Sequence, residues 1–272
     1  MNGLIDLFQS FKAYGDRLAI TYRSGIRRTA YSYAELYGNA SRMASLLAEA
    51  DVNPGDRVIL WGPNHPAWVF AFWGIVARGA VAVPVDFMSG AERAEGIAKL
   101  SGATFAIQSR LKPEPLGGVK SVVMENLELQ LKGYSPSVEL SGGASDDLCE
   151  LVYTSGTTGA PKGVALSHRN LLANVQQVAA HFPTVTSKYR FLSLLPLSHM
   201  FEQTTGFLVP LYLGGSIIYL RTLKPSAIME AFSEEDVYAM IAVPRLLQLL
   251  KGSVERELAA KGLLGVFNKL GA

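Results

Sequence analysis

The sequence is poor in residues that build disulfides, metal centres and strongly charged surfaces. Cys149 is the only cysteine among 272 residues, so no internal disulfide can form and a reducing compartment is expected. One cysteine and four scattered histidines do not make a zinc site, so no protein metal site is expected. The net charge is only +2, which gives no electrostatic reason to expect nucleic-acid binding.

Long apolar runs and a secretory signal are also missing. The longest apolar run, residues 67–77, is too short to cross a bilayer and ends at Arg78. Residues 1–6 lack the basic start and apolar stretch of a signal peptide. A cytoplasmic protein is therefore expected, and the composition leaves peripheral membrane contact open.

What is present is a regular alternation of strand and helix patterns. Residues 57–61 and 80–85 have the apolar character of buried strands. The segment between them, residues 66–77, begins at a proline and stops before Gly79, which is typical of a helix. This order implies a parallel strand pair with a right-handed crossover.

The alternation continues along the chain and predicts the fold class. Further strands are expected at 103–107, 121–124, 148–153, 164–167, 190–194, 216–220 and 238–242. Further helices are expected at 33–50, 90–100, 169–180, 202–213, 227–232 and from 245 onward. The prediction is an α/β protein with layered, largely parallel sheets flanked by helices.

One segment, residues 153–163, fits neither a helix nor a strand. It reads Tyr-Thr-Ser-Gly-Thr-Thr-Gly-Ala-Pro-Lys-Gly, with three glycines and one lysine among its hydroxyl residues. Its hydroxyls and backbone amides would lack partners in a core, so it belongs at the surface. Glycines permit close backbone approach, hydroxyls donate hydrogen bonds and lysine supplies charge, so a polyphosphate is the ligand that fits.

The Walker phosphate loop, Gly-x-x-x-x-Gly-Lys-Ser/Thr, does not account for this segment. Gly156 and Lys162 have the right separation, but Pro161 replaces the second glycine and has no N–H to offer. Gly163 follows the lysine, so the magnesium-binding hydroxyl is missing. A different way of holding phosphates is indicated.

The segment resembles the phosphate-loop signature of the AMP-forming adenylating enzymes: acyl-CoA synthetases, luciferases and nonribosomal peptide adenylation domains. That signature reads Tyr-Thr-Ser-Gly-Ser/Thr-Thr-Gly-x-Pro-Lys-Gly, and every fixed position matches. Residues 31–36, 75–86 and 195–202 resemble further motifs of this family in the same order. The last of them, Leu-Pro-Leu-Ser-His-Met-Phe-Glu, is most like the form found in long-chain fatty-acid–CoA ligases.

The resemblance implies a reaction in two halves. A carboxylate attacks the α-phosphorus of ATP and pyrophosphate leaves; a thiol, usually that of coenzyme A, then attacks the acyl-adenylate. The carboxylate is already ionised, so no general base is needed. The main task is to neutralise phosphate charge and align the reacting groups. ATP, Mg²⁺ and coenzyme A are implied, with the main protein ligand of Mg²⁺ outside this chain.

The resemblance also assigns site residues. ATP phosphates are expected to contact Thr154, Ser155, Gly156, Thr157, Thr158, Gly159 and Lys162. Lys162 would supply a point charge, and His199, at a strand-to-helix junction, would lie near the acyl or adenylate pocket. These two are the predicted catalytic residues. Glu202 and Asp86 are given local roles instead, the first with the dipole of its helix.

The family is roughly twice as long as this chain, by its general size and the domain-length prior. Its later part carries a Gly-x-Thr-Glu segment for AMP and magnesium, a ribose-binding aspartate and a lysine on a mobile C-terminal domain. None has an equivalent before Ala272. The chain is therefore expected to be an incomplete N-terminal AMP-binding domain, inactive alone. Two subdomains are expected, one at residues 55–183 and the other combining 1–50 with 186–272.

The acid is expected to be a long-chain fatty acid, with small molecules as the only expected partners; the oligomeric state is not indicated. Three alternatives stay open. The enzyme could pass its acyl-adenylate to a carrier protein, or it could activate an aryl acid. A non-catalytic nucleotide-binding module is the third. A reading frame that continues into the later family motifs would favour an enzyme.

Overall fold

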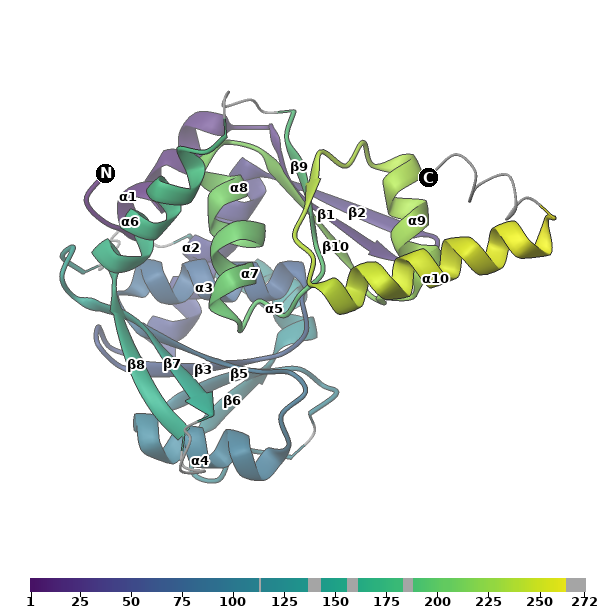
Figure 1. Cartoon of the computed structure of the whole chain (residues 1–272). Coiled ribbons are helices and arrows are strands. Elements are labelled where there is room, and N and C mark those ends of the chain that lie inside the picture. The colour runs from purple at the N-terminus through teal and green to yellow at the C-terminus, as the bar shows by residue number, and fades with distance from the viewer. Residues whose placement is uncertain (113, 137–142, 156–160, 183–187, 263–272) are drawn as a thin grey trace.

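The computed structural model describes residues 1–112, 114–136, 143–155, 161–182 and 188–262 (Figure 1). Its strands are β1 (Leu18–Ser24), β2 (Arg27–Ser32), β3 (Arg57–Trp61), β4 (Val81–Val85), β5 (Phe105–Gln108), β6 (Lys120–Val123), β7 (Leu148–Ser155), β8 (Pro161–Ser167), β9 (Arg190–Ser193), β10 (Ser216–Leu220) and β11 (Ala239–Met240).

The helices alternate with these strands. The α-helices are α1 (Leu4–Ser10), α2 (Tyr33–Glu49), α3 (Pro66–Arg78), α4 (Ala91–Ser101), α5 (Leu127–Gln130), α6 (His168–Ala179), α7 (Met200–Glu202), α8 (Val209–Tyr212), α9 (Pro225–Glu234) and α10 (Pro244–Ala260). Short 3₁₀ turns are η1 (Phe11–Tyr14), η2 (Met124–Asn126) and η3 (Leu131–Gly133), and η4 (Gln203–Leu208) is a π-helix.

Two sheets organise the described residues. One has six strands in the order β6-β5-β3-β4-β7-β8, and the other has five in the order β11-β9-β10-β1-β2. The strand pairs are parallel except for the antiparallel pairs β1–β2 and β7–β8. The predicted class, α/β with largely parallel sheets flanked by helices, is confirmed.

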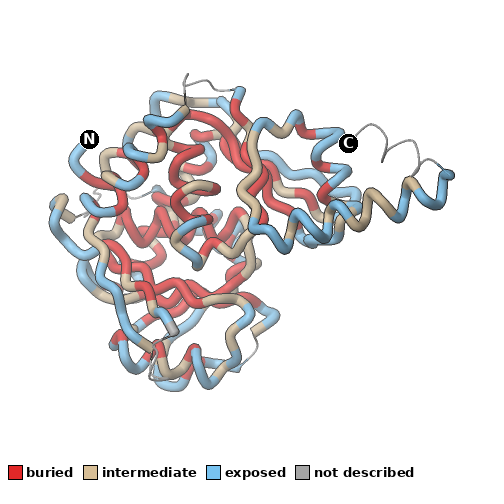
Figure 2. Tube along the Cα trace, viewed as in Figure 1, coloured by how far each residue is buried: buried red, intermediate tan, exposed pale blue. Residues whose placement is uncertain are grey.

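Helices α2 and α3 lie between the two sheets (Figure 1). A capping box at Ser32 and Glu35 starts α2, and His65 caps α3 by accepting the Ala67 N–H on Nδ1 at 3.1 Å. Residues 66–77 of α3 are all buried, and Figure 2 shows the buried residues concentrated in this layer and in the strands. An all-round apolar helix is therefore a central core element.

The core is rich in aromatic contacts between α3 and the π-helix. Phe207 of η4 makes edge contacts with Trp68, Phe72 and Trp73, at centroid distances of 5.8, 5.2 and 5.9 Å. Such edge-to-face pairs stabilise beyond simple burial. These contacts pack η4, which begins four residues after His199, against α3.

Residues 154–155 and 161–163, predicted to be neither helix nor strand, are the facing ends of β7 and β8, because strand pairing satisfies their backbone groups. The short helix α5 and its flanking turns η2 and η3 were not predicted either.

Two further regions differ from the sequence predictions. The first is the N-terminus, where no elements were expected before residue 32 but α1 and the β1–β2 hairpin form. Four of the six β2 residues are exposed and β2 is an edge strand, so its sequence lacks an apolar signal. The second is the helix expected at 202–213, which is wound as α7, η4 and α8. Pro210 in α8 has no N–H to continue a regular ladder, which favours the wider turns before it.

Candidate active site

A hairpin of β7 and β8 brings two predicted site residues together. Thr154 lies directly opposite Lys162 in the antiparallel ladder, and Ser155 lies opposite Pro161. The side chains of Thr154 and Lys162 are exposed. The other predicted phosphate ligands, Gly156, Thr157, Thr158 and Gly159, lie outside the described residues. The described part of the hairpin thus places Thr154 and Lys162 at directly opposed backbone positions.

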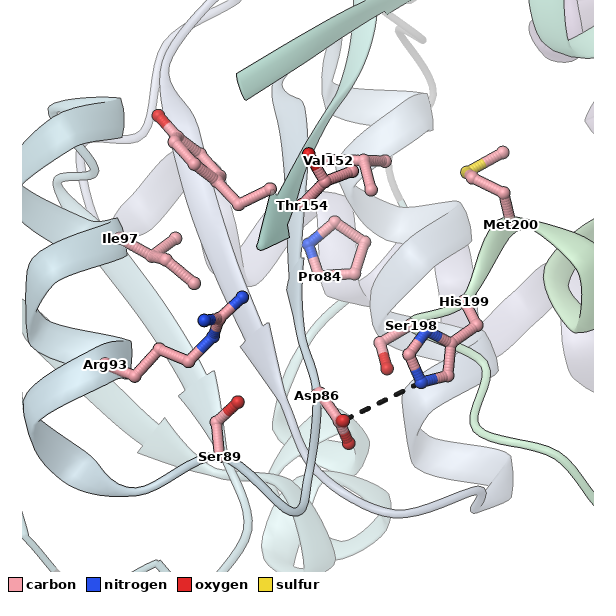
Figure 3. Close-up of a pocket in the computed structure, with 11 residues that line it drawn as sticks. Pro84, Asp86, Ser89, Arg93, Ile97, Val152, Thr154, Ser198, His199 and Met200 are labelled. Atoms are coloured by element: carbon pink, nitrogen blue, oxygen red, sulfur yellow. Dashed lines mark ion pairs between the residues drawn. The ribbon is translucent and has the colours of Figure 1, made fainter. Parts of the chain in front are cut away.

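A cavity of about 540 Å³ opens beside the end of β7. It is lined by Pro84, Asp86, Ser89, Arg93, Ile97, Val152, Tyr153, Thr154, Ser198, His199 and Met200 (Figure 3). These residues come from the carboxyl ends of β4 and β7, from α4, and from the segment between β9 and α7. Ligands of open parallel sheets bind at such strand ends. The cavity therefore joins Thr154 and His199, while Lys162 is not among its lining residues.

His199 faces Asp86 across this cavity. The Nε2 atom of His199 is 3.7 Å from Oδ2 of Asp86, as the dashed line in Figure 3 marks. The other carboxylate oxygen, Oδ1, accepts the Met88 N–H at 2.9 Å, so the carboxylate is held in one orientation. Asp86 has the local bond expected from sequence and also a contact that the sequence did not reveal.

Asn64 holds the segment that leads to His199. Its side-chain Nδ2 donates to the Leu195 carbonyl at 2.7 Å, and its Oδ1 accepts the Leu197 N–H at 3.0 Å. The His199 N–H in turn donates to the Pro196 carbonyl at 3.0 Å. The Asn64 amide thus donates and accepts one hydrogen bond each, which fixes residues 195–199 relative to β3 and α3. No local pattern in the sequence points to this role.

Arg93 on α4 is the cation that the sequence analysis missed. Its guanidinium points into the cavity between Ser89 and Pro84 (Figure 3). Within the described part of the chain it makes no ion pair or hydrogen bond. An unpaired guanidinium in a cavity beside Thr154 can bind an anion such as a phosphate.

Two buried carboxyl groups, Glu150 and Glu202, lie two residues in sequence from the lining residues Val152 and Met200. Glu202 was expected to act on the dipole of its helix from the first turn, but its side chain is fully buried. Burial raises the pKa of Glu202 to about 7, against the opposing effect of the Ser193 hydroxyl and the nearby backbone amides. Burial likewise raises the pKa of Glu150 to about 8, against a hydrogen bond from Gln203. Glu202 lies in the first turn of α7, as the sequence predicted, and its complete burial is a feature that the sequence did not reveal.

A second hollow, of about 390 Å³, shares Met200 with the first. Besides Met200 it is lined by the apolar residues Leu166, Leu171, Val178 and Phe201 and by the polar residues Asn170, Asn174, Thr204 and Thr205 of β8, α6 and the segment from α7 to η4. Phe201 is 58% exposed, which is unusual for so large an apolar side chain. An apolar hollow that adjoins the polar cavity can take the hydrocarbon part of a carboxylic acid.

No metal centre is found among the residues that the structure describes: no three His, Cys, Asp or Glu side chains cluster there. Asp86 is the one carboxylate that lines the larger cavity. No described helix has the length and apolar character needed to cross a membrane.

Comparison with known proteins places these features in context. A family model described as AMP-binding enzyme matches residues 7–268. Over 228 residues the chain is 35% identical to a feruloyl-CoA synthase of Amycolatopsis sp, covering 82% of this chain and 45% of that protein. Over 261 residues it is 27% identical to long-chain-fatty-acid–CoA ligase 1 of Schizosaccharomyces pombe, covering 84% and 38% respectively.

Solved structures show the same fold. ATP-bound MatB from Rhodopseudomonas palustris superposes with a TM-score of 0.80 at 24% identity, covering 90% of this chain and 50% of that one. The N-terminal domain of FACL13 from Mycobacterium tuberculosis, bound to an inhibitor, gives a TM-score of 0.79 at 26% identity, covering 92% and 65%. The chain spans about half the length of the curated relatives it matches.

Proposed function

The chain belongs to the AMP-binding enzyme family, and we propose that it forms the ATP-phosphate-binding half of an AMP-forming acid–thiol ligase. One observation carries the proposal: Thr154, opposite Lys162 on the hairpin, lines one cavity with His199. A hydroxyl, a guanidinium and an imidazole around one hollow, with a lysine on the adjoining strand β8, suit a polyphosphate and a reacting carboxylate.

In the proposed reaction, a carboxylate oxygen bonds to the α-phosphorus of ATP and the bond to pyrophosphate breaks. The thiol of coenzyme A then attacks the acyl carbon and AMP leaves. Lys162 and Arg93 lower the repulsion between the two anions, and Thr154 donates to a phosphate oxygen. His199, oriented by Asp86, faces the reacting centre. Mg²⁺ would accompany ATP and neutralise phosphate charge; no described residue cluster is assigned to it.

For the acid, we propose a long-chain fatty acid. The motif Leu-Pro-Leu-Ser-His-Met-Phe-Glu and the apolar hollow beside Met200 support it. An aryl acid is the second candidate, favoured by the 35% identity to a protein named feruloyl-CoA synthase. Delivery to a carrier protein and a non-catalytic nucleotide-binding role are outcomes that the experiment below distinguishes.

The proposal has a structural part as well. We assign residues 55–183 and residues 1–50 with 186–272 to two α/β subdomains of the AMP-binding domain. The membership of the sheets supports this, because β3–β8 fall in the first range and β1, β2 and β9–β11 in the second. A separate C-terminal domain would complete the site, and a cytoplasmic location with small-molecule partners remains part of the proposal.

The test is a substrate panel on the protein extended through its natural reading frame. Fatty acids of several lengths, ferulate and coumarate are compared by AMP release, with and without coenzyme A. We expect release that depends on a fatty acid and rises with coenzyme A. Release with ferulate alone would favour the aryl acid, release that ignores coenzyme A would favour a carrier protein, and no release with any acid would favour the non-catalytic module. The 272-residue chain by itself should not catalyse carboxylate-dependent ATP–pyrophosphate exchange, and robust exchange would overturn that part.

A further inference from the structure

Glu150 and Gln203 form a buried polar contact, each within three residues in sequence of a residue that lines the larger cavity. Both residues have no exposed surface, and Nε2 of Gln203 donates to Oε1 of Glu150 at 2.7 Å. A buried carboxyl group is costly unless it is neutral or well paired. This contact is not explained by phosphate binding, because neither residue lines the cavity.

The contact joins the two halves of the proposed site. Glu150 lies on β7 four residues before Thr154, or about 13 Å along a strand. Gln203 lies four residues after His199, whose carbonyl accepts the Gln203 N–H at 2.9 Å. Strand β7 belongs to the six-stranded sheet, while the helix from Met200 follows β9 of the five-stranded sheet. One side-chain pair therefore ties the strand of Thr154 to the helix that follows His199.

Two atoms of the pair have no partner in the described part of the chain: Oε2 of Glu150 and Oε1 of Gln203. These are the atoms that a second hydrogen bond would join if Glu150 carried a proton on Oε2. The acid O–H would donate to the amide carbonyl while the amide N–H donates to the acid carbonyl. An ionised Glu150 would satisfy neither atom, because both would be acceptors.

The surroundings favour the protonated form. The residues opposite Glu150 in the sheet are apolar, Ala82 on β4 and Leu166 on β8. The titratable neighbours are Cys149 on the same strand and Glu202 beside Gln203, with Tyr219 of β10 near Glu202; the packed helix α6 carries His168 and Arg169 in its first turn. None of these makes a hydrogen bond or ion pair with Glu150 in the described residues. Burial accordingly raises the pKa of Glu150 to about 8.

We propose that Glu150 is protonated at neutral pH and forms with Gln203 a reciprocal acid–amide pair that positions Thr154 relative to His199. The positioning role rests on the proposed adenylation site, whereas the protonated pair does not. A neutral pair fixes the two segments and keeps a negative charge away from the anionic substrates. Above the pKa of Glu150 the O–H donor is lost and a charge appears in the core.

The first experiment is carboxyl ¹³C NMR of the 272-residue chain, labelled at glutamate. We expect the Glu150 resonance, assigned by its loss in Glu150→Gln, to report a neutral acid at pH 7 and to titrate near pH 8. A chemical shift showing that Glu150 is already ionised at pH 6 would overturn the proposed acid–amide pair. This measurement needs no activity, so it stays informative if the proposed ligase function fails.

The second experiment measures adenylation by the extended protein between pH 6 and 9.5. Glu150→Met, which keeps the volume but removes both hydrogen bonds, should lower kcat about tenfold with little change in the KM for ATP. Glu150→Gln, which can form a reciprocal amide pair, should restore kcat to near the wild-type value and remove the decline above pH 8. Glu202→Gln is the matched control, since Glu202 is also fully buried with a raised pKa, whereas the Gln203 side chain donates to Glu150.

The outcomes distinguish a specific effect of the Glu150–Gln203 pair from a general effect of replacing a buried carboxyl group. A decline above pH 8 that persists unchanged in Glu150→Gln contradicts the positioning role. Equal effects of Glu150→Gln and Glu202→Gln on the pH profile contradict it as well. If Glu150→Met does not fold, the comparison of wild type with Glu150→Gln still decides.

Discussion

Thr154 and Lys162 are directly opposed residues of an antiparallel pair, so their side chains emerge on the same face of the β7–β8 hairpin. Opposed Cβ atoms in such a pair lie about 5 Å apart. The positions that carry a hydroxyl donor and a positive charge are thus brought opposite each other by the strand pairing. Residues 154 and 162 are eight positions apart in the sequence, and the hairpin brings them opposite each other.

Replacing Lys162 should weaken phosphate binding without unfolding the protein. Because its side chain is exposed, Lys162→Ala removes charge but little packing. Loss of one charge-assisted hydrogen bond predicts about a tenfold rise in the KM for ATP in the extended protein. Lys251→Ala is the control, since Lys251 is an exposed lysine of α10 paired only with Glu255 among the described groups. Unchanged ATP kinetics in Lys162→Ala would count against its role.

Arg93 should contribute to anion binding because its guanidinium enters the cavity without a described partner. Arg93→Ala is expected to weaken ATP or pyrophosphate binding about tenfold, and Arg93→Lys to recover only part of it, since an ammonium lacks the planar fork. Titration calorimetry with pyrophosphate measures both. Equal affinity in wild type and Arg93→Ala would show that the guanidinium does not contact the ligand.

Asp86 should act on the reaction through His199. Asp86→Asn keeps an oxygen for the Met88 N–H but removes the charge that lies 3.7 Å from His199. We expect a kcat about three- to tenfold lower, with an unchanged melting temperature. Asp56→Asn is the control, because Asp56 likewise accepts a turn N–H, from Asn53 at 2.8 Å. A kcat as high as wild type would remove Asp86 from the site.

Glu235 should make stability depend on pH at the acid side. Its side chain is 1% exposed and accepts hydrogen bonds from Arg23 at 3.0 Å and Arg28 at 2.8 Å. Burial alone would raise the pKa of Glu235, but Arg28 and Arg23 together lower it. The folded state therefore releases the proton more readily than the unfolded one. The stabilisation is complete above the ordinary glutamate pKa and is lost as the pH falls through the lowered value.

Urea unfolding of wild type and Glu235→Gln between pH 3 and 7 tests this. We expect Glu235→Gln to lower the unfolding free energy by about 3 kcal/mol at pH 7, because the buried arginine loses a charged partner. The difference should shrink toward pH 3. Glu257→Gln, at an exposed pair with Lys261, should change nothing measurable. A difference that is independent of pH would contradict the assignment.

Gly74 should be intolerant of a side chain. A Cβ there would lie 2.5 Å from the Cβ of Met43 and 3.1 Å from the Ala40 carbonyl oxygen, where α2 and α3 cross. Gly74→Ala is expected to destabilise by about 1–3 kcal/mol, since a tightly packed core resists added volume. Gly96→Ala in α4 is the control, because its Cβ would meet nothing within 4 Å and alanine favours helix. Equal stability of both variants would refute the steric argument.

The sequence predicted those parts of the fold that have a local physical cause. The capping box at Ser32 and the proline that opens α3 mark helix starts, and the apolar strands around α3 predicted parallel pairing. The hairpin β1–β2 escaped prediction, because its edge strand is polar and its other partner, β10, lies almost 200 residues later. Pairing across such a separation leaves no local signal.

The candidate site also has some residues with a local signal in the sequence and others without one. The glycine-rich composition of residues 153–163 and the histidine motif are local signals, and two residues that they singled out, Thr154 and His199, line one cavity. Arg93, Asn64 and the Glu150–Gln203 contact depend on how distant segments pack, so no spacing rule reveals them. The burial of Glu202 was not foreseen, because its position in the first turn gives no sign of which face of the helix packs inward.

The place of β1 between β10 and β2 has a consequence for the order of folding. The six-stranded sheet uses residues 57–167 only, so it can assemble as soon as that stretch has been synthesised. Strand β1 emerges much earlier but must wait for β10 at residues 216–220. During that interval the β1–β2 hairpin is exposed as an unpaired edge, which is a template for wrong pairing. Chaperone binding on the ribosome would therefore matter most for the β1–β2 hairpin.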